Sequence, residues 1–153
     1  PGYRPAAGLA RYLCGTPAVL SLAALECGVD TVLAANAHGG MTVLRHKSLA
    51  LTWLFAERVH ATCSGLTLVS PREDADRGSQ VCLAHAAIAY PVIQALIARG
   101  VVGDFRAPDI LRFGFSPLYT RFVDAWDAAE HLRQVLDSGE WERPEFNQRH
   151  AVT

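Results

Sequence analysis

An arginine in a short β-rich segment is the residue of this sequence best suited to bind a charged ligand. Residues 110–115 read Ile-Leu-Arg-Phe-Gly-Phe, and strand alternation places the bulky apolar side chains on one face: Leu111, Phe113 and Phe115. Arg112 then lies on the opposite face, beside Gly114, which leaves open space above the sheet. A guanidinium in such a place can hold a carboxylate through two parallel hydrogen bonds. The same spacing also fits a solvated arginine on an edge strand.

A second candidate is a polar residue that precedes an apolar stretch near the N-terminus. Thr16 is a favourable helix N-cap and Pro17 a favourable first helical residue, so the pattern predicts a helix that starts there. Apolar residues carry this helix to Glu26, and Gly28 predicts its end. From the residue types alone, the role of Thr16 is that of a helix cap.

The elements that position Arg112 follow from the hydrophobic periodicity. The longest helical pattern covers residues 41–63. From residue 66 on, the order is strand, strand, helix, strand, strand, helix, over residues 66–70, 77–85, 88–99, 101–105, 110–115 and 117–136. This order predicts an α/β (α+β) fold, with a small, mostly antiparallel sheet and helices on one face. On the last helix, the apolar stripe predicts inward-facing side chains at Phe122, Trp126, Ala129 and residues 132–136.

The composition is that of an ordinary globular protein. Of 153 residues, 50% are hydrophobic and 19% are charged, and the formal net charge is −1. No block of basic residues is present, so we expect neither nucleic acid nor an anionic membrane as a partner. We find no uninterrupted apolar run of the roughly 18 residues that a membrane helix needs, and no signal peptide. We therefore expect a cytoplasmic protein without a membrane span.

The cysteines do not form a metal-binding or disulfide pattern. They are scattered, without a Cys-x-x-Cys pair: Cys14, Cys27, Cys63 and Cys82. We therefore expect no metal site and reduced thiols, as in cytosolic proteins.

Three strings around Arg112 resemble the C-terminal part of bacterial kynureninases. They are Gly-Val-Val-Gly-Asp-Phe-Arg at 100–106, Pro-Asp-Ile-Leu-Arg-Phe-Gly at 108–114 and Pro-Leu-Tyr-Thr-Arg-Phe-Val-Asp-Ala-Trp at 117–126. Kynureninases use pyridoxal 5'-phosphate and have the aspartate-aminotransferase fold (fold type I). The resemblance implies that Arg112 binds the α-carboxylate of the substrate. It also implies that Thr16 contacts the cofactor phosphate and that Gly15 faces the aromatic end of the substrate.

The same resemblance implies an activity and a domain organisation. The complete enzyme would hydrolyse L-kynurenine or 3-hydroxykynurenine to anthranilate or 3-hydroxyanthranilate and L-alanine, in tryptophan catabolism. Its active site would be shared between the two chains of a homodimer. Residues 1–40 would form the edge of the large cofactor domain, 41–63 a connecting helix, 64–138 the small C-terminal domain and 139–153 a tail.

The one lysine of the sequence does not fit the role of the cofactor-binding lysine. Lys47 shares a helical stripe with Leu44 and Leu51, so its stem is expected to pack and its ammonium group to reach outward. The family's cofactor-binding lysine lies upstream of the matched region. We therefore expect Lys47 to be structural, no catalytic residue in these 153 residues, and no activity of this chain alone. The sequence also lacks an initiator methionine, which suggests that it starts inside a longer protein.

Two other functions remain open at this point. One is a desulfurase or an aminotransferase of the same fold, because such enzymes also need an arginine for the substrate carboxylate. The other is a non-enzymatic module that binds amino acids, since small regulatory domains have the same order of strands and helices.

Overall fold

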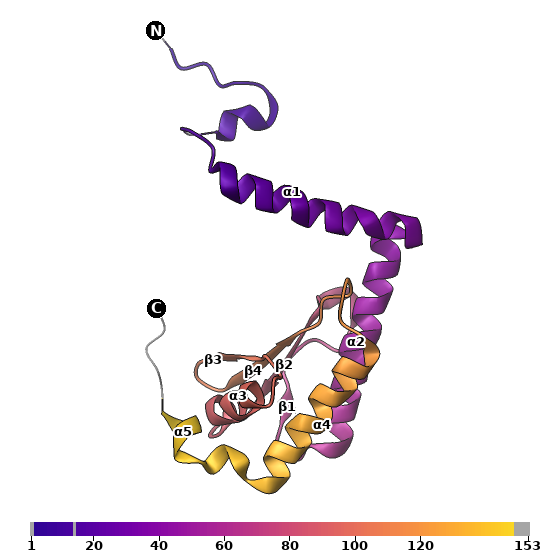
Figure 1. Ribbon diagram of the computed structural model, residues 1–153, viewed down its shortest axis with the longest axis vertical. Helices are drawn as coiled ribbons and strands as arrows, with labels where there is room; N and C mark the ends of the chain where they lie inside the picture. The colour runs from indigo at the N-terminus through magenta and orange to yellow at the C-terminus, as the bar shows by residue number, and fades with distance from the viewer. Residues whose placement is uncertain (1, 14, 149–153) are drawn as a thin grey trace. The chain divides into compact units, whose positions relative to one another are not determined.

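The computed structural model describes residues 2–13 and 15–148 (Figure 1). The chain divides into two compact units, Pro1–Met41 and Thr42–Thr153. Cys14 lies outside the described residues, as do residues 149–153 of the expected tail.

The second unit contains a four-stranded antiparallel sheet, as the sequence predicts. Its strands are β1 (Thr67–Leu68), β2 (Gln80–Ala84), β3 (Asp104–Arg106) and β4 (Ile110–Gly114), in the order β1-β2-β4-β3. The strand expected at 101–105 starts late, at Asp104. The reason is that the backbone of the preceding residues closes a helix end, because Val101 N donates to Leu96 O at 2.9 Å and Gly103 N to Val101 O at 3.1 Å.

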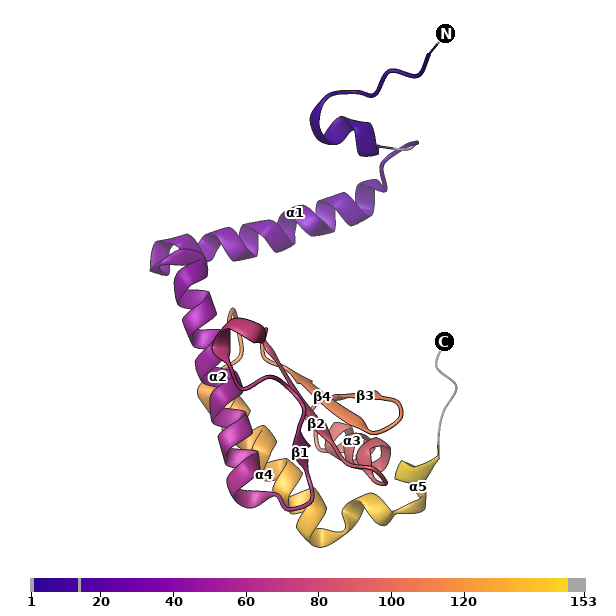
Figure 2. The ribbon, with the colours of Figure 1, turned by 180° about the vertical axis from the view of Figure 1, so that it is seen from behind.

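Helices cover one face of this sheet (Figures 1 and 2). They are α2 (Gly40–Thr62), α3 (Ala89–Ala98) and α4 (Phe122–Ser138). The first two are close to the predicted ranges, but the predicted start of the last helix at residue 117 is wrong, because the chain turns there and α4 is capped by Arg121. Gly100, just after α3, has a φ of +84° and Gly100 N donates to Ile97 O, which is the expected left-handed helix end.

The core lies between the helices and the apolar face of the sheet. Phe55 of α2 packs on Phe113 and Phe115, with ring centroids 4.9 and 5.1 Å apart. The predicted burial of one face of residues 110–115 is therefore confirmed. Phe122 and Trp126 of α4, which the helical stripe predicts to face inward, are instead 48% and 42% exposed.

The segment after α4 packs against α3. It forms a 3-10 turn at Glu140–Glu142 and the short helix α5 (Pro144–Asn147). Arg99, at the end of α3, pairs with Glu140 at 2.5 Å and donates to Gln134 Oε1 at 2.8 Å. Trp141 and Phe146 are partly buried against the core.

The first unit consists mainly of one apolar helix, α1 (Val19–Ala34), and the described residues of α1 are all exposed. The predicted boundaries of this helix are wrong at both ends. Ala18, not Thr16, is the N-cap, because its ψ of 85° keeps it outside the helix. The helix also continues through Gly28, whose cost of about 1 kcal/mol is tolerable inside a long run of helix-forming residues.

By length and composition, one described segment, Val19–His38, could cross a membrane. The expectation of a protein without a membrane span stays a prediction. The same length and composition are found in buried helices of larger proteins. Glu26 and Asp30 lie near the middle of the segment, where an ionised side chain costs about 2.5–3.5 kcal/mol on insertion. These two carboxylates disfavour insertion of the segment into a membrane.

Candidate functional site

The Arg112 guanidinium lies on the uncovered face of the sheet, as the alternation predicts. Arg112 is in the middle of β4, and the Cα register pairs it with Cys82 of β2 and Asp104 of β3. A Cβ added at Gly114 would meet nothing within 4 Å, so the space beside Arg112 on this face is open. The Arg112 side chain is 32% exposed, enough for a small ligand to reach it.

Arg112 is held by one carboxylate. Arg112 Nη2 donates to Asp104 Oδ2, and the same oxygen accepts a hydrogen bond from Arg106 Nε at 2.8 Å. Within residues 2–13 and 15–148, Arg112 has no other polar partner. One of its five N–H donors is therefore used, and the rest can bind an incoming anion.

Sequence reasoning missed Asp104. A signal for it was present, since Asp104 and Arg112 are opposite charges on two short β-rich segments joined by a turn. Opposite charges directly across an antiparallel pair attract. Finding the pair required the register, which the late start of β3 obscured.

On the other side of Arg112, the polar groups of β2 either have hydrogen-bond partners or are exposed to solvent. Cys82 is half-buried, and its backbone N donates to Ser70 Oγ at 2.8 Å. Gln80 is exposed and pairs with Gly114, so its side chain needs no protein partner.

The N-terminal candidates, Gly15 and Thr16, lie in the first unit and are both exposed. Gly15 has a φ of +86°, which a residue with a side chain rarely adopts. Thr16 makes no cap, and the actual cap, Ala18, has no side-chain acceptor for the first turn of α1. Amide groups at such a helix start favour an anion, so this segment fits one contact to a phosphate.

The ammonium group of Lys47 is hydrogen-bonded within the protein. Lys47 Nζ donates to the backbone carbonyl of Pro117 at 2.8 Å, and the residue is half-buried. This contact fixes the segment after β4 to α2 and suits a structural lysine. The chain thus offers groups for a phosphate and for a carboxylate, but its one lysine does not fit a cofactor-binding role.

His85 is a structural residue at the start of α3. His85 Nδ1 accepts hydrogen bonds from the backbone N of Ala87 at 3.3 Å and of Ile88 at 3.4 Å. Over the described ranges, no group of three or more metal-binding side chains gathers.

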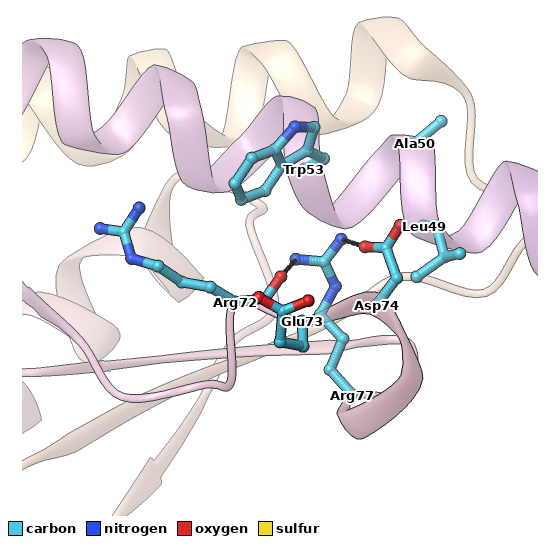
Figure 3. Close-up of a pocket in the computed structure, with 7 residues that line it drawn as sticks. All are labelled: Leu49, Ala50, Trp53, Arg72, Glu73, Asp74 and Arg77. Atoms are coloured by element: carbon cyan, nitrogen blue, oxygen red, sulfur yellow. Dashed lines mark hydrogen bonds and ion pairs between the residues drawn. The ribbon is translucent and has the colours of Figure 1, made fainter.

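A pocket of the second unit is formed by α2 and the loop before β2 (Figure 3). Seven residues line its roughly 430 Å³: Leu49, Ala50, Trp53, Arg72, Glu73, Asp74 and Arg77. The Arg77 guanidinium in it is already neutralised, because Nη2 binds Asp74 Oδ1 at 2.5 Å, and it lies 5.1 Å from the Trp53 ring. The contacts of Arg77 in this pocket are therefore structural, and the pocket is not a candidate carboxylate site.

The Arg-Gly-Ser segment that begins at Arg77 fastens the loop to α2. Besides the contact of Arg77 with Trp53, Ser79 Oγ and the buried Ser48 Oγ lie 2.6 Å apart. Both contacts link residues 77–79 to α2. They give Arg77 and Ser79 a structural role that needs no bound ligand.

Comparison with known proteins gives one consistent family. The family described as "Kynureninase C-terminal domain" matches residues 44–132. Proteins named kynureninase from Burkholderia mallei (strain SAVP1) and Burkholderia pseudomallei (strain 1106a) are each 52% identical over 155 residues. A kynureninase from Pseudomonas fluorescens is 53% identical over the same length.

These alignments cover 100% of this chain and 36% of each relative. The chain thus spans about a third of the length of the curated relatives it matches. The matched family region contains the whole sheet, both Arg112 and Asp104, and most of α2 and α4. The chain therefore belongs to the kynureninase family and contains the C-terminal domain of that family.

Proposed function

We propose that the full-length protein hydrolyses L-kynurenine or 3-hydroxykynurenine to anthranilate or 3-hydroxyanthranilate and L-alanine. The observation that carries this proposal is Arg112, a guanidinium with free donors on the open face of β4, in a region that matches the kynureninase C-terminal domain. Both substrates have an α-carboxylate, the group that such a fork binds best.

Pyridoxal 5'-phosphate, when bound, supplies the electron sink for breaking the carbon–carbon bond. The residues of this chain bind and orient. Thr16 would hold the cofactor phosphate through a hydrogen bond from its hydroxyl group, and Gly15 would leave room for the aromatic end of the substrate. Arg112 holds the carboxylate and so fixes the direction of the bond to be broken, which is a positioning effect.

The other candidates are less well supported. A desulfurase or aminotransferase of the same fold would use the same arginine, and a binding module would need no lysine at all. The names of the relatives favour kynureninase over both. We further propose a cytoplasmic homodimer, in which α1 is covered by the rest of the full-length protein or by the partner chain. The exposed apolar surface of α1 supports this proposal.

The test uses the full-length enzyme with L-kynurenine, and anthranilate and L-alanine are measured. Arg112→Lys keeps the charge but loses the two-pronged contact, so kcat/KM should fall by roughly thirtyfold to several thousandfold, or about 2–5 kcal/mol. The cofactor content should not change. A decarboxylated kynurenine analogue should bind parent and variant equally well, and a variant that loses both ligands alike would contradict the role of Arg112.

We also propose that residues 1–153 alone are inactive, because their one lysine is bound to Pro117. The isolated chain with pyridoxal phosphate and kynurenine should give no more anthranilate than the cofactor alone. Turnover that disappears in Lys47→Ala would contradict this proposal and make Lys47 functional.

A further inference from the structure

We infer that Asp104 is a positioning residue for Arg112, and that it stays bound to Arg112 when a carboxylate ligand is present. This inference rests on the proposed carboxylate-binding role of Arg112. It adds a second residue, Asp104, whose carboxylate fixes the direction of the guanidinium without touching the ligand.

The contact comes from the hairpin itself. Asp104 and Arg112 are Cα partners in the antiparallel β3–β4 pair, so their side chains leave the sheet on the same face. Arg112 Nη2 donates to Asp104 Oδ2. Without Asp104, the long arginine side chain would sample several rotamers over an open surface, because Gly114 beside it has no side chain.

The donors of Arg112 leave room for both carboxylates. A guanidinium carries five N–H groups, and four of them form two edges, each able to bind a carboxylate with two hydrogen bonds. Nη2 contributes one hydrogen to each edge, and Asp104 uses only one of them. One complete edge therefore remains, so a ligand need not displace Asp104.

The local charge also favours an incoming anion. Asp104 accepts from Arg106 Nε at 2.8 Å as well as from Arg112, so two positive charges surround one negative charge. The group keeps a net charge of +1 after Asp104 is counted. Asp104 therefore orients Arg112 without cancelling its attraction for a carboxylate.

A competing interpretation gives the opposite sign. If Asp104 occupied the ligand's place on Arg112, it would act as an internal competitor, and its removal would tighten carboxylate binding. The positioning role instead predicts weaker binding, since the ligand must then fix the arginine side chain by itself. Fixing one such side chain changes affinity by roughly three- to tenfold.

The experiment uses the full-length enzyme and variants at Asp104. Asp104→Ala should raise KM for kynurenine roughly three- to tenfold, with kcat nearly unchanged. Asp104→Asn keeps an oxygen acceptor for Arg112 Nη2 and should restore most of this loss. Asp109→Ala, the same change in the same hairpin at a side chain without a described partner, is the matched control and should behave as the parent.

Calorimetric binding of L-alanine and ethylamine separates this inference from the proposed function, since these ligands differ in the carboxylate and need no turnover. The parent should prefer L-alanine, and Asp104→Ala should reduce that preference while ethylamine binding stays the same.

A preserved or increased preference would overturn the role of Asp104, as would equal losses for both ligands. A reduced preference in an enzyme that does not cleave kynurenine would refute the proposed substrate and leave Asp104 in place. Equal binding of both ligands by the parent would overturn the carboxylate role of Arg112, and with it that of Asp104.

Discussion

The two units of this chain differ in where their side chains find partners. In the second unit, α2, α3, α4 and the sheet share one core, and the fully buried residues come from all of them. In the first unit, α1 is more apolar than α2 and α4, yet none of its residues is buried against the part of the chain that the structure describes. An apolar helix in water is stabilised by packing, which the described residues of this chain do not provide for α1.

The candidate residues follow the same division. Arg112 is positioned by its own unit, through the register of β3 and β4 and through Asp104. Thr16 is exposed, and the helix next to it is capped by Ala18 instead. The position of Arg112 therefore depends only on its own unit. The role of Thr16, in contrast, can be measured only in the full-length protein.

The largest expected difference between the units is in stability. In the isolated chain, Phe55→Ala removes a fully buried ring that contacts Phe113 and Phe115, and should lower the free energy of unfolding by about 3–5 kcal/mol. Leu25→Ala in α1 is the matched control. Leu25 is 61% exposed, so its loss should change the free energy by less than about 0.5 kcal/mol. Urea unfolding measures both, and similar effects would show that α1 has a core of its own.

The second prediction concerns Thr16 in the full-length enzyme. In the proposed role of Thr16, Thr16→Ala removes a charge-assisted hydrogen bond to the cofactor phosphate, worth about 1.5–3 kcal/mol, so cofactor affinity should fall roughly ten- to a hundredfold. Turnover at saturating cofactor should largely recover, because the hydroxyl takes no part in bond breaking. Cofactor titration measures the loss. An unchanged titration would mean that Thr16 has no contact with the phosphate.

The third prediction tests whether α1 is covered in the full-length protein. Cys27 of α1 is exposed in this chain, whereas Cys63 of the second unit is buried, and burial raises the pKa of its thiol. Iodoacetamide should therefore modify Cys27 quickly in the isolated chain and at least tenfold more slowly in the full-length enzyme. Cys63 should react slowly in both. Equal reactivity of Cys27 in the two proteins, read by peptide mass spectrometry, would mean that α1 stays uncovered.

The smallest effect is electrostatic and lies within the second unit. Hydrogen bonds from Arg133 and Gln134 lower the pKa of Glu130 from 4.5 to about 2. Because the folded pKa is the lower one, this stabilisation is present above pH 4.5 and is lost as the pH falls toward 2. Glu130→Gln should therefore flatten the decrease of the melting temperature over this range. Glu57→Gln, at an exposed carboxylate, should leave this decrease unchanged. If the melting temperatures of the parent and of Glu130→Gln decreased equally with pH, Glu130 would not contribute to the pH dependence.

Sequence patterns predicted the second unit well, because the spacing of apolar residues in its strands and helices corresponds to the residues that are buried. Alternation at residues 110–115 gave both the buried face and the free face of Arg112. The helical stripe was less accurate at the rim of α4, where Arg58 covers the Trp126 ring at 3.8 Å. A long cationic side chain can cover an aromatic ring at the surface, so an apolar position in the stripe need not be buried.

The first unit was predicted less well, because its signals are local. Thr16 and Pro17 fit a helix start by residue type, and Gly28 fits a helix end, but the backbone follows neither. The contacts that outweigh such weak preferences are not visible in a single sequence. Asp104 was missed for the related reason that strand register depends on the turn between the strands.

Among the described strands, the order β1-β2-β4-β3 leaves β3 at an edge of the sheet, with one row of its backbone groups unpaired by another of these strands. Exposed edges of this kind invite pairing with other chains and lead to aggregation. β3 is only three residues long, and two of these, Asp104 and Arg106, are charged. Replacing both charges with valine would create a continuous apolar edge. Asp104, which we assign to orienting Arg112, therefore also protects the sheet edge together with Arg106, and losing both charges would expose the sheet to self-association.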